Sequence, residues 1–103
     1  MIYICDIDNT ICKTEGEDYE NATPYKDRIK KMNKLYDEGH TILYETARGQ
    51  RTGINWMELT RKQLKKWGVK YKSVGEKHYG DFIIDDHAIN SNQFFKSRSL
   101  KEV

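Results

Sequence analysis

The sequence is poor in proline, in cysteine and in long apolar runs. One proline and 33% charged residues in 103 positions argue against a fibrous chain, and 37% hydrophobic residues argue against a disordered one. No apolar run approaches the length of a membrane span, and the N-terminal MIYICDID lacks a basic stretch followed by a long apolar one. We therefore expect a cytoplasmic globular protein with no membrane partner.

Positive and negative charges are nearly balanced, so the chain has little excess charge of either sign. The formal net charge of +2 is too small to indicate a nucleic-acid or membrane partner by itself. A length of 103 residues suffices for one compact domain, so residues 1–103 are expected to form a single domain.

The two cysteines, Cys5 and Cys12, have no CxxC spacing and no paired histidine nearby. This arrangement argues against a zinc site. We expect both to be reduced, structural thiols, because free cysteine is often buried.

What is present is an alternation of strand-like and helix-like segments. Short apolar runs predict strands at residues 1–5, 41–45, 69–74 and 81–84. Apolar side chains at helical spacing predict helices over residues 24–37, 56–67 and 89–95, the first of them capped by Thr23. This order indicates an α/β fold with a mainly parallel sheet flanked by helices.

Polar residues follow the predicted strands. Asp6, Thr46 and Asp85 each come just after an apolar run. Sites in open parallel sheets form at the carboxyl ends of the strands, so we expect these residues to meet at one rim.

This rim has the groups that hydrolysis of a phosphate ester needs. Asp6 can attack phosphorus, since carboxylates form aspartyl-phosphates. Asp8, two residues further on, can protonate the leaving oxygen and then activate water. Mg²⁺ prefers oxygen ligands, which Asp6, Asp85 and Asp86 can supply.

Thr46 and Lys77 add to this set. Thr46, with main-chain N–H groups nearby, can bind phosphoryl oxygens, and Lys77 supplies a fixed positive charge. Each feature also has a structural interpretation: DxDxT as a turn, Thr46 as a helix cap, Lys77 as a surface lysine, Asp85-Asp86 as a solvated turn. The joint order of these features favours catalysis.

That order resembles the motifs of the haloacid dehalogenase (HAD) superfamily of phosphatases over nearly the whole chain. DIDNT, from Asp6 to Thr10, resembles the first motif, and TILYETARG carries the second at Thr46. Lys77 corresponds to the third, and IIDD at 83–86 to the fourth. Within the superfamily, TARG and QLKKWGVKY are similar to small phosphatases of capsule-biosynthesis loci.

The resemblance implies a three-layer, Rossmann-like fold with helices on both faces of the sheet. Residues 11–40 and 49–68 each have room for a loop and one helix, which implies a capless member with an open site. The departures are Glu45 in place of an apolar residue, His78 in place of proline, and His87 after the acidic pair. None of them removes a catalytic group.

The resemblance also assigns roles to residues of this sequence. The catalytic residues are Asp6, Asp8, Thr46 and Lys77. The substrate-binding residues are Thr10, Thr46, Ala47, Arg48 and Lys77. The Mg²⁺ ligands are Asp6, Asp8, Asp85 and Asp86.

We expect the substrate to be a small phosphorylated metabolite such as a sugar phosphate. The loop at residues 13–21 is acidic, with Glu15, Glu17, Asp18 and Glu20. These carboxylates would repel a long polyanion. The alternative is a polynucleotide-end (3′-) phosphatase, because Arg48 and Arg51 can steer either substrate.

Three further alternatives concern partners and non-enzymatic roles. The 12% aromatic residues leave some for a homo-oligomer interface, although core packing can use them all. A receiver-type domain also combines aspartates, a lysine and Mg²⁺, but it has its acidic pair first and its phosphoacceptor after the third strand. A phosphate-binding domain without catalysis is not expected to keep Asp6, Asp8, Lys77 and Asp85 together.

Overall fold

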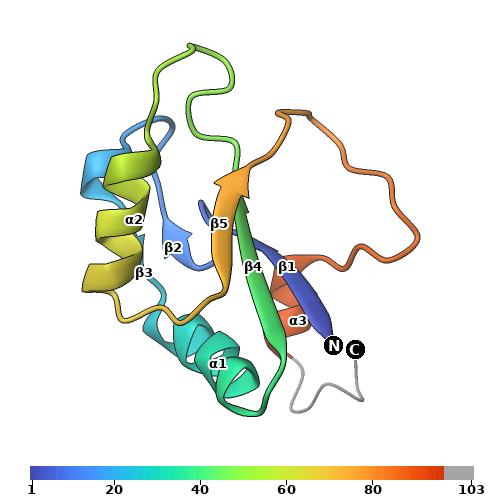
Figure 1. The fold of residues 1–103 in the computed structure, drawn as a ribbon. Helices are drawn as coiled ribbons and strands as arrows, with labels where there is room; N and C mark the ends of the chain where they lie inside the picture. The colour runs from blue at the N-terminus through green and yellow to red at the C-terminus, as the bar shows by residue number, and fades with distance from the viewer. Residues whose placement is uncertain (97–103) are drawn as a thin grey trace.

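The computed structural model describes residues 1–96 (Figure 1). Its strands are β1 (Ile2–Asp6), β2 (Cys12–Lys13), β3 (Thr23–Pro24), β4 (Thr41–Thr46) and β5 (Ser73–Glu76). Its helices are α1 (Lys26–Asp37), α2 (Met57–Lys66) and α3 (Ser91–Lys96), with a 3-10 turn η1 (Tyr19–Asn21).

The main sheet is parallel and has three strands in the order β1-β4-β5. Asp6 at the end of β1 is paired with Glu45 of β4, and Thr46 is paired with Glu76 at the end of β5. The three strands therefore end at the same edge, and the expectation of an α/β fold with a parallel sheet is confirmed. β2 and β3 form a separate antiparallel pair.

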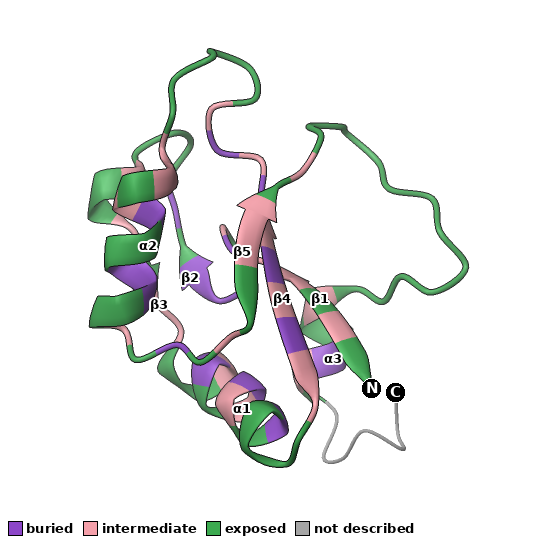
Figure 2. Cartoon of the chain, viewed as in Figure 1, coloured by how far each residue is buried: buried purple, intermediate pink, exposed green. Residues whose placement is uncertain are grey.

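The core lies between the central strand and the helices. Ile42 and Tyr44 are buried on alternate positions of β4, as a strand with one covered face requires (Figure 2). The buried residues of α1 recur at helical spacing and are Ile29, Met32 and Leu35. Burying each such aliphatic side chain contributes about 1.5–3 kcal/mol.

The described helices pack on one face of the sheet. Tyr3 and Ile42 are paired on neighbouring strands and so point to the same side. The Tyr3 ring lies 6.2 Å from that of Phe94 in α3, which places α3 on this face as well. On the other face Ile2 and Ile4 are 68% and 63% exposed. The implied three-layer arrangement, with helices on both faces, is therefore not seen in residues 1–96.

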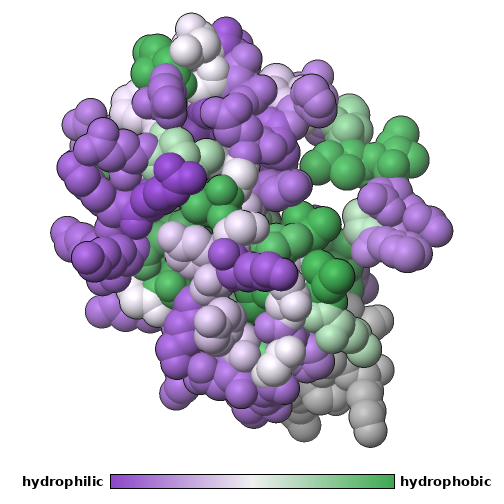
Figure 3. Space-filling view, in the orientation of Figure 1, coloured by the Kyte–Doolittle hydropathy of each residue, from purple (hydrophilic) through white to green (hydrophobic). Residues whose placement is uncertain are grey.

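The predicted strand at 81–84 is wrong. The structure has no strand between β5 and α3, and Phe82, Ile83 and Ile84 are 87%, 70% and 97% exposed. Apolar composition favours a strand, but a strand also needs a neighbour to pair with, and β1 remains the edge of the sheet. Figure 3 shows hydrophobic surface both over β1 and on the loop that follows β5.

Two other boundaries differ from the prediction. Thr23 does not cap α1, because Thr23 and Pro24 pair with Lys13 and Cys12 in the small antiparallel ribbon. The strand predicted at 69–74 begins instead at Ser73. No helix in residues 1–96 is long and apolar enough to cross a membrane.

Candidate active site

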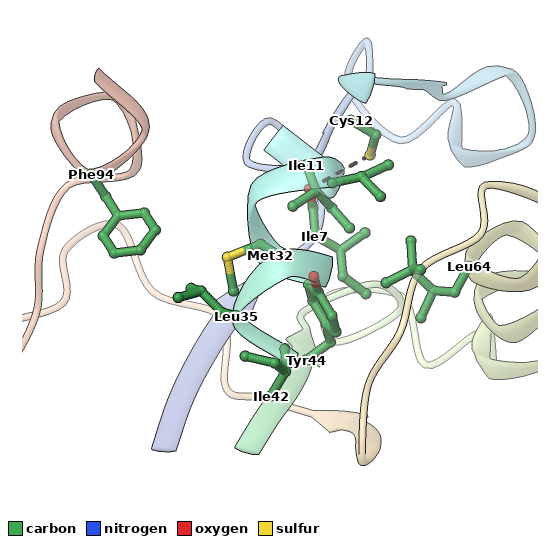
Figure 4. Close-up of a cluster of buried hydrophobic side chains, with 11 residues drawn as sticks. Ile7, Ile11, Cys12, Met32, Leu35, Ile42, Tyr44, Leu64 and Phe94 are labelled. Atoms are coloured by element: carbon green, nitrogen blue, oxygen red, sulfur yellow. Dashed lines mark hydrogen bonds between the residues drawn. The ribbon is translucent and has the colours of Figure 1, made fainter. Parts of the chain in front are cut away.

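A tight turn directly follows β1. The main-chain N–H groups of Thr10 and Ile11 both donate to the carbonyl of Ile7, at 3.1 and 3.0 Å. Ile7 and Ile11 are fully buried and anchor the turn in the core (Figure 4). Since Ile7 points inward, its neighbours Asp6 and Asp8 are directed toward the rim of the sheet.

Asp6 is paired with a lysine that follows the third strand. The Lys77 Nζ lies 2.9 Å from Asp6 Oδ1, and the Thr10 hydroxyl donates to Asp6 Oδ2 at 3.3 Å. The main-chain N–H of Lys77 donates to the Thr46 carbonyl at 3.0 Å, which ties the lysine to β4. The Asp6 side chain is 37% exposed. Its carboxylate is therefore oriented, neutralised and accessible to a ligand.

Asp8 is held by a buried arginine. Arg48 Nε donates to Asp8 Oδ2 at 2.9 Å, and Arg48 Nη2 donates to Oδ1 at 2.8 Å. The Thr14 hydroxyl donates to Oδ1 at 2.6 Å. The Arg48 side chain is 0% exposed and that of Asp8 is 22% exposed. A two-pronged pair of this kind is among the stronger charge-assisted contacts in proteins.

The remaining contacts of Arg48 come from α2 and from the 13–21 loop. Arg48 Nη1 donates to Gln63 Oε1 at 2.6 Å and to Thr60 Oγ1 at 3.2 Å. The Tyr19 ring covers the guanidinium, with its centroid 4.8 Å from Cζ. Burial raises the pKa of the Tyr19 hydroxyl. Arg48 was expected to bind substrate, but its guanidinium contacts Asp8 and α2 rather than the open rim.

Thr46 and Ala47 lie at the end of β4, on the rim. Thr46 is 2% exposed, and its hydroxyl accepts a hydrogen bond from the main-chain N–H of Arg48 at 3.1 Å. Ala47 is half-buried. Glu45 is paired with Asp6, so a second carboxylate lies at this end of the sheet. The structure therefore gathers Asp6, Thr46 and Lys77, together with Asp8, at one edge.

Asp85 and Asp86 do not lie with these residues at the edge of the sheet. Both are exposed on the loop after β5. The main-chain N–H of His87 donates to Asp85 Oδ1 at 2.8 Å and holds the pKa of that carboxyl below its ordinary value. Residues 1–96 contain no group of three histidine, cysteine or acidic side chains close enough to hold a metal. Residues 81–84, which precede the pair, form no strand and so are not part of the sheet whose edge carries Asp6.

Sequence reasoning missed the residues that contact the Asp8–Arg48 pair. Tyr19, Thr60 and Gln63 contact Arg48, and Thr14 contacts Asp8. One signal was present for two of them: Thr60 and Gln63 share the buried stripe of α2 with Leu64. A glutamine on an apolar stripe indicates a polar partner in the interior, because buried polar groups are nearly always hydrogen-bonded.

The two cysteines are consistent with structural thiols. Burial is the main cause that raises the pKa of Cys5, to about 12. Burial likewise raises the pKa of Cys12, which is 0% exposed. Thiols with raised pKa values are poor nucleophiles at neutral pH, so neither is a candidate catalytic residue.

Gly49 closes the turn that carries Arg48, and Gly49→Ala is expected to destabilise the protein. Its φ is 82°, and an added Cβ would clash with the Ile54 carbonyl oxygen. Gly53→Ala is the matched control, since Gly53 has a φ of 77° but open space around it. We expect Gly49→Ala to lower the free energy of unfolding by roughly 1–3 kcal/mol more than the control. Urea unfolding measures both, and equal losses would contradict the clash.

The fold and the site together define a class: an α/β protein with acidic residues, a lysine and a threonine at the carboxyl end of a parallel sheet. The chain matches no protein-family profile and no curated protein. It is similar to the crystal structure of a target protein from Vibrio cholerae, with 28% identity and a TM-score of 0.87. That match covers 98% of this chain and 91% of the other.

A second similarity is to a chain of the Pnkp1/Rnl/Hen1 complex. The identity is 19% and the TM-score 0.60, over 97% of this chain and 35% of that one. At this identity the likeness shows the fold alone.

Proposed function

We propose that the protein is a phosphomonoester hydrolase that works through an aspartyl-phosphate on Asp6. The observation that carries this proposal is the contact of 2.9 Å between Lys77 Nζ and Asp6 Oδ1, with Asp8 on the same turn. An anionic nucleophile that attacks an anionic phosphate needs charge compensation, and a fixed lysine supplies it. The HAD-like order of motifs supports the same chemistry.

The proposed reaction has two steps. In the first, an Asp6 oxygen forms a bond to phosphorus while the ester P–O bond breaks, and Asp8, which this step requires in its protonated form, gives its proton to the leaving oxygen and becomes the carboxylate that pairs with Arg48. In the second, water attacks phosphorus, the bond to Asp6 breaks, and Asp8 takes a proton from the water. Inorganic phosphate leaves, and both carboxyl groups return to their starting forms. Thr46 and the N–H of Ala47 are proposed to bind the phosphoryl oxygens, and Thr10 is proposed to join them by turning its hydroxyl from Asp6 Oδ2 to the substrate.

Mg²⁺ is proposed as the cofactor, and the residues at the rim fit it in part. The half-exposed Asp6 carboxylate is a suitable ligand. The Asp8 carboxylate is occupied by Arg48, so we assign its main-chain carbonyl to the ion. When bound, the ion neutralises charge on the phosphoryl oxygens.

Asp85 and Asp86 can join the ion only if the loop that carries them moves. β1 has a free edge, and its exposed Ile2 and Ile4 resemble Phe82–Ile84 in being apolar and uncovered. If residues 81–84 paired parallel to β1, Asp85 would follow the end of a new strand at the same rim as Asp6. Burial of these apolar side chains would favour that pairing.

Removal of Mg²⁺ is expected to stop the reaction. Purified protein should hydrolyse 4-nitrophenyl phosphate with added Mg²⁺ and lose at least about 100-fold in rate with a chelator, because metal stabilisation of the transition state is worth several kcal/mol. Excess Mg²⁺ should restore the rate. An unchanged rate of hydrolysis in the presence of the chelator would contradict the proposed Mg²⁺ requirement but not the proposed role of Asp6 as nucleophile.

A small phosphorylated metabolite is proposed as the substrate. The acidic loop supports this class, since Glu15 and Glu17 side chains are 80% and 53% exposed beside the site. A panel of sugar phosphates, nucleotides and 3′-phosphorylated oligonucleotides tests it through kcat/KM. A clear preference for the oligonucleotide would instead identify a polynucleotide-end phosphatase.

A further inference from the structure

We propose that Arg48 does not bind substrate and is instead the residue that positions the Asp8 carboxyl group for its part in the reaction. The proposal rests on the phosphatase function proposed above. It concerns how one carboxyl group can be held for proton transfer in a site that is open to water.

The two oxygens of Asp8 have different environments. Oδ1 accepts hydrogen bonds from Arg48 Nη2 at 2.8 Å and from the Thr14 hydroxyl at 2.6 Å, and the Cys12 thiol lies 3.7 Å away. Oδ2 accepts from Arg48 Nε at 2.9 Å. A carboxylate oxygen has two lone pairs, so Oδ1 is saturated and Oδ2 has one direction left. Oδ2 is therefore the oxygen that this network leaves available to a reacting group.

The guanidinium cannot serve the substrate at the same time. Its side chain is 0% exposed, and Nε, Nη1 and Nη2 all donate to protein groups. To reach the rim it would have to leave Asp8, Thr60 and Gln63 without their donors. Leaving buried polar groups unpaired is unfavourable, so the arginine is expected to stay in place.

The residues around Arg48 are arranged to accept its hydrogen bonds. Gln63 donates through Nε2 to the Tyr19 carbonyl at 2.6 Å, and this orientation turns Oε1 toward the arginine. Thr60 donates its hydroxyl proton to the Trp56 carbonyl at 2.8 Å, which leaves its lone pairs for Arg48 Nη1. Each acceptor is thus fixed by a second contact of its own, as expected for a shell that orients a functional group.

The test compares substrates that need a proton with one that does not. An alkyl phosphate needs protonation of its leaving oxygen, whereas 4-nitrophenolate leaves without it. Because kcat/KM covers the steps up to the phosphoenzyme, loss of Asp8 positioning should appear in the first substrate and not in the second. Competitive inhibition by inorganic phosphate reports substrate binding separately.

Arg48→Met is expected to lower kcat/KM for an alkyl phosphate by about 10–100-fold, with less than about 3-fold change for 4-nitrophenyl phosphate. The inhibition constant of inorganic phosphate should also change by less than about 3-fold, since a group outside the binding step leaves affinity unaltered. Arg48→Lys keeps the positive charge but cannot donate two parallel hydrogen bonds to Asp8, so it should recover only part of the lost kcat/KM for the alkyl phosphate. The control is Arg61→Met, an exposed arginine on α2, which should match the wild type.

Parallel losses for both substrates and for phosphate affinity would overturn the proposal and make Arg48 a substrate ligand. Unchanged kinetics in Arg48→Met would also overturn it. If the Arg48 variants do not fold by circular dichroism, Gln63→Leu and Thr14→Val test the same network, with a smaller loss confined to the alkyl phosphate. A wild-type protein that hydrolyses no phosphate ester would contradict the proposed function itself, which is a different outcome from any of these.

Discussion

Asp6→Asn is expected to abolish turnover while the fold persists. The asparagine amide is nearly the same size as the carboxylate but is a poor nucleophile toward phosphorus, so no aspartyl-phosphate can form. Loss of a covalent nucleophile lowers kcat by orders of magnitude, and we expect at least about 10⁴-fold. Steady-state hydrolysis of 4-nitrophenyl phosphate, and trapping of the phosphoenzyme by rapid acid quench, measure the two consequences.

Stability should change little in this variant. The ion pair with Lys77 joins side chains that are 37% and 23% exposed, and such part-exposed pairs contribute up to about 1 kcal/mol. Asp27→Asn on the exposed face of α1 is the matched control and should keep full activity. Appreciable turnover by pure, folded Asp6→Asn would show that another residue attacks phosphorus.

The rim of the sheet was the part of the site that the sequence could predict. Asp6 and Thr46 follow apolar runs that do form parallel strands, and parallel strands bring their ends together wherever they lie along the chain. Lys77 reaches the rim because it follows β5, although the predicted strand was displaced by several residues. The placement of these residues at the rim can thus be predicted from a single sequence, because each follows an apolar run that forms a strand.

The direction of Arg48 could not be predicted in the same way. An arginine beside a phosphate site suits a substrate and a carboxylate equally well, and the sequence places no charge next to it that decides between them. What decides is burial: the turn after β4 points the side chain inward, to Asp8 and to Gln63 on α2. That choice depends on packing between segments that are distant in sequence.

The segment at 81–84 shows that a local strand pattern does not guarantee a strand. Its composition indicates a strand, yet a strand is a property of two segments, and the pairing partner does not appear in the local pattern. Asp85 and Asp86 follow this segment, so their place relative to Asp6 depends on that one pairing. The assignment of Asp85 and Asp86 as metal ligands therefore stays a prediction.

Asp8→Asn is the second change for which we expect a large effect, and it should differ from Asp6→Asn in kind. Without a group to activate water, breakdown of the phosphoenzyme should slow by about 10²–10⁴-fold. With 4-nitrophenyl phosphate, whose leaving group needs no proton, phosphoenzyme formation should continue. Rapid mixing should then show a burst of one nitrophenolate per active site, followed by slow turnover, with the Mg²⁺ requirement unchanged. Absence of the burst, or equal loss of metal affinity, would count against the acid/base role.

The same variant should also be less stable, because the ionised form of Asp8 neutralises an arginine whose side chain is 0% exposed. Asparagine can still accept one of the two hydrogen bonds but leaves the guanidinium charge uncompensated, at a cost of roughly 2–4 kcal/mol in the free energy of unfolding. Arg48→Met in the Asp8→Asn background removes that stranded charge, so the double variant should be less destabilised than the two single losses added together. Urea unfolding of the four proteins measures this coupling. A coupling near zero would mean that the Asp8–Arg48 contact contributes nothing to the fold, whereas a large coupling combined with the burst shows one carboxylate serving both stability and proton transfer.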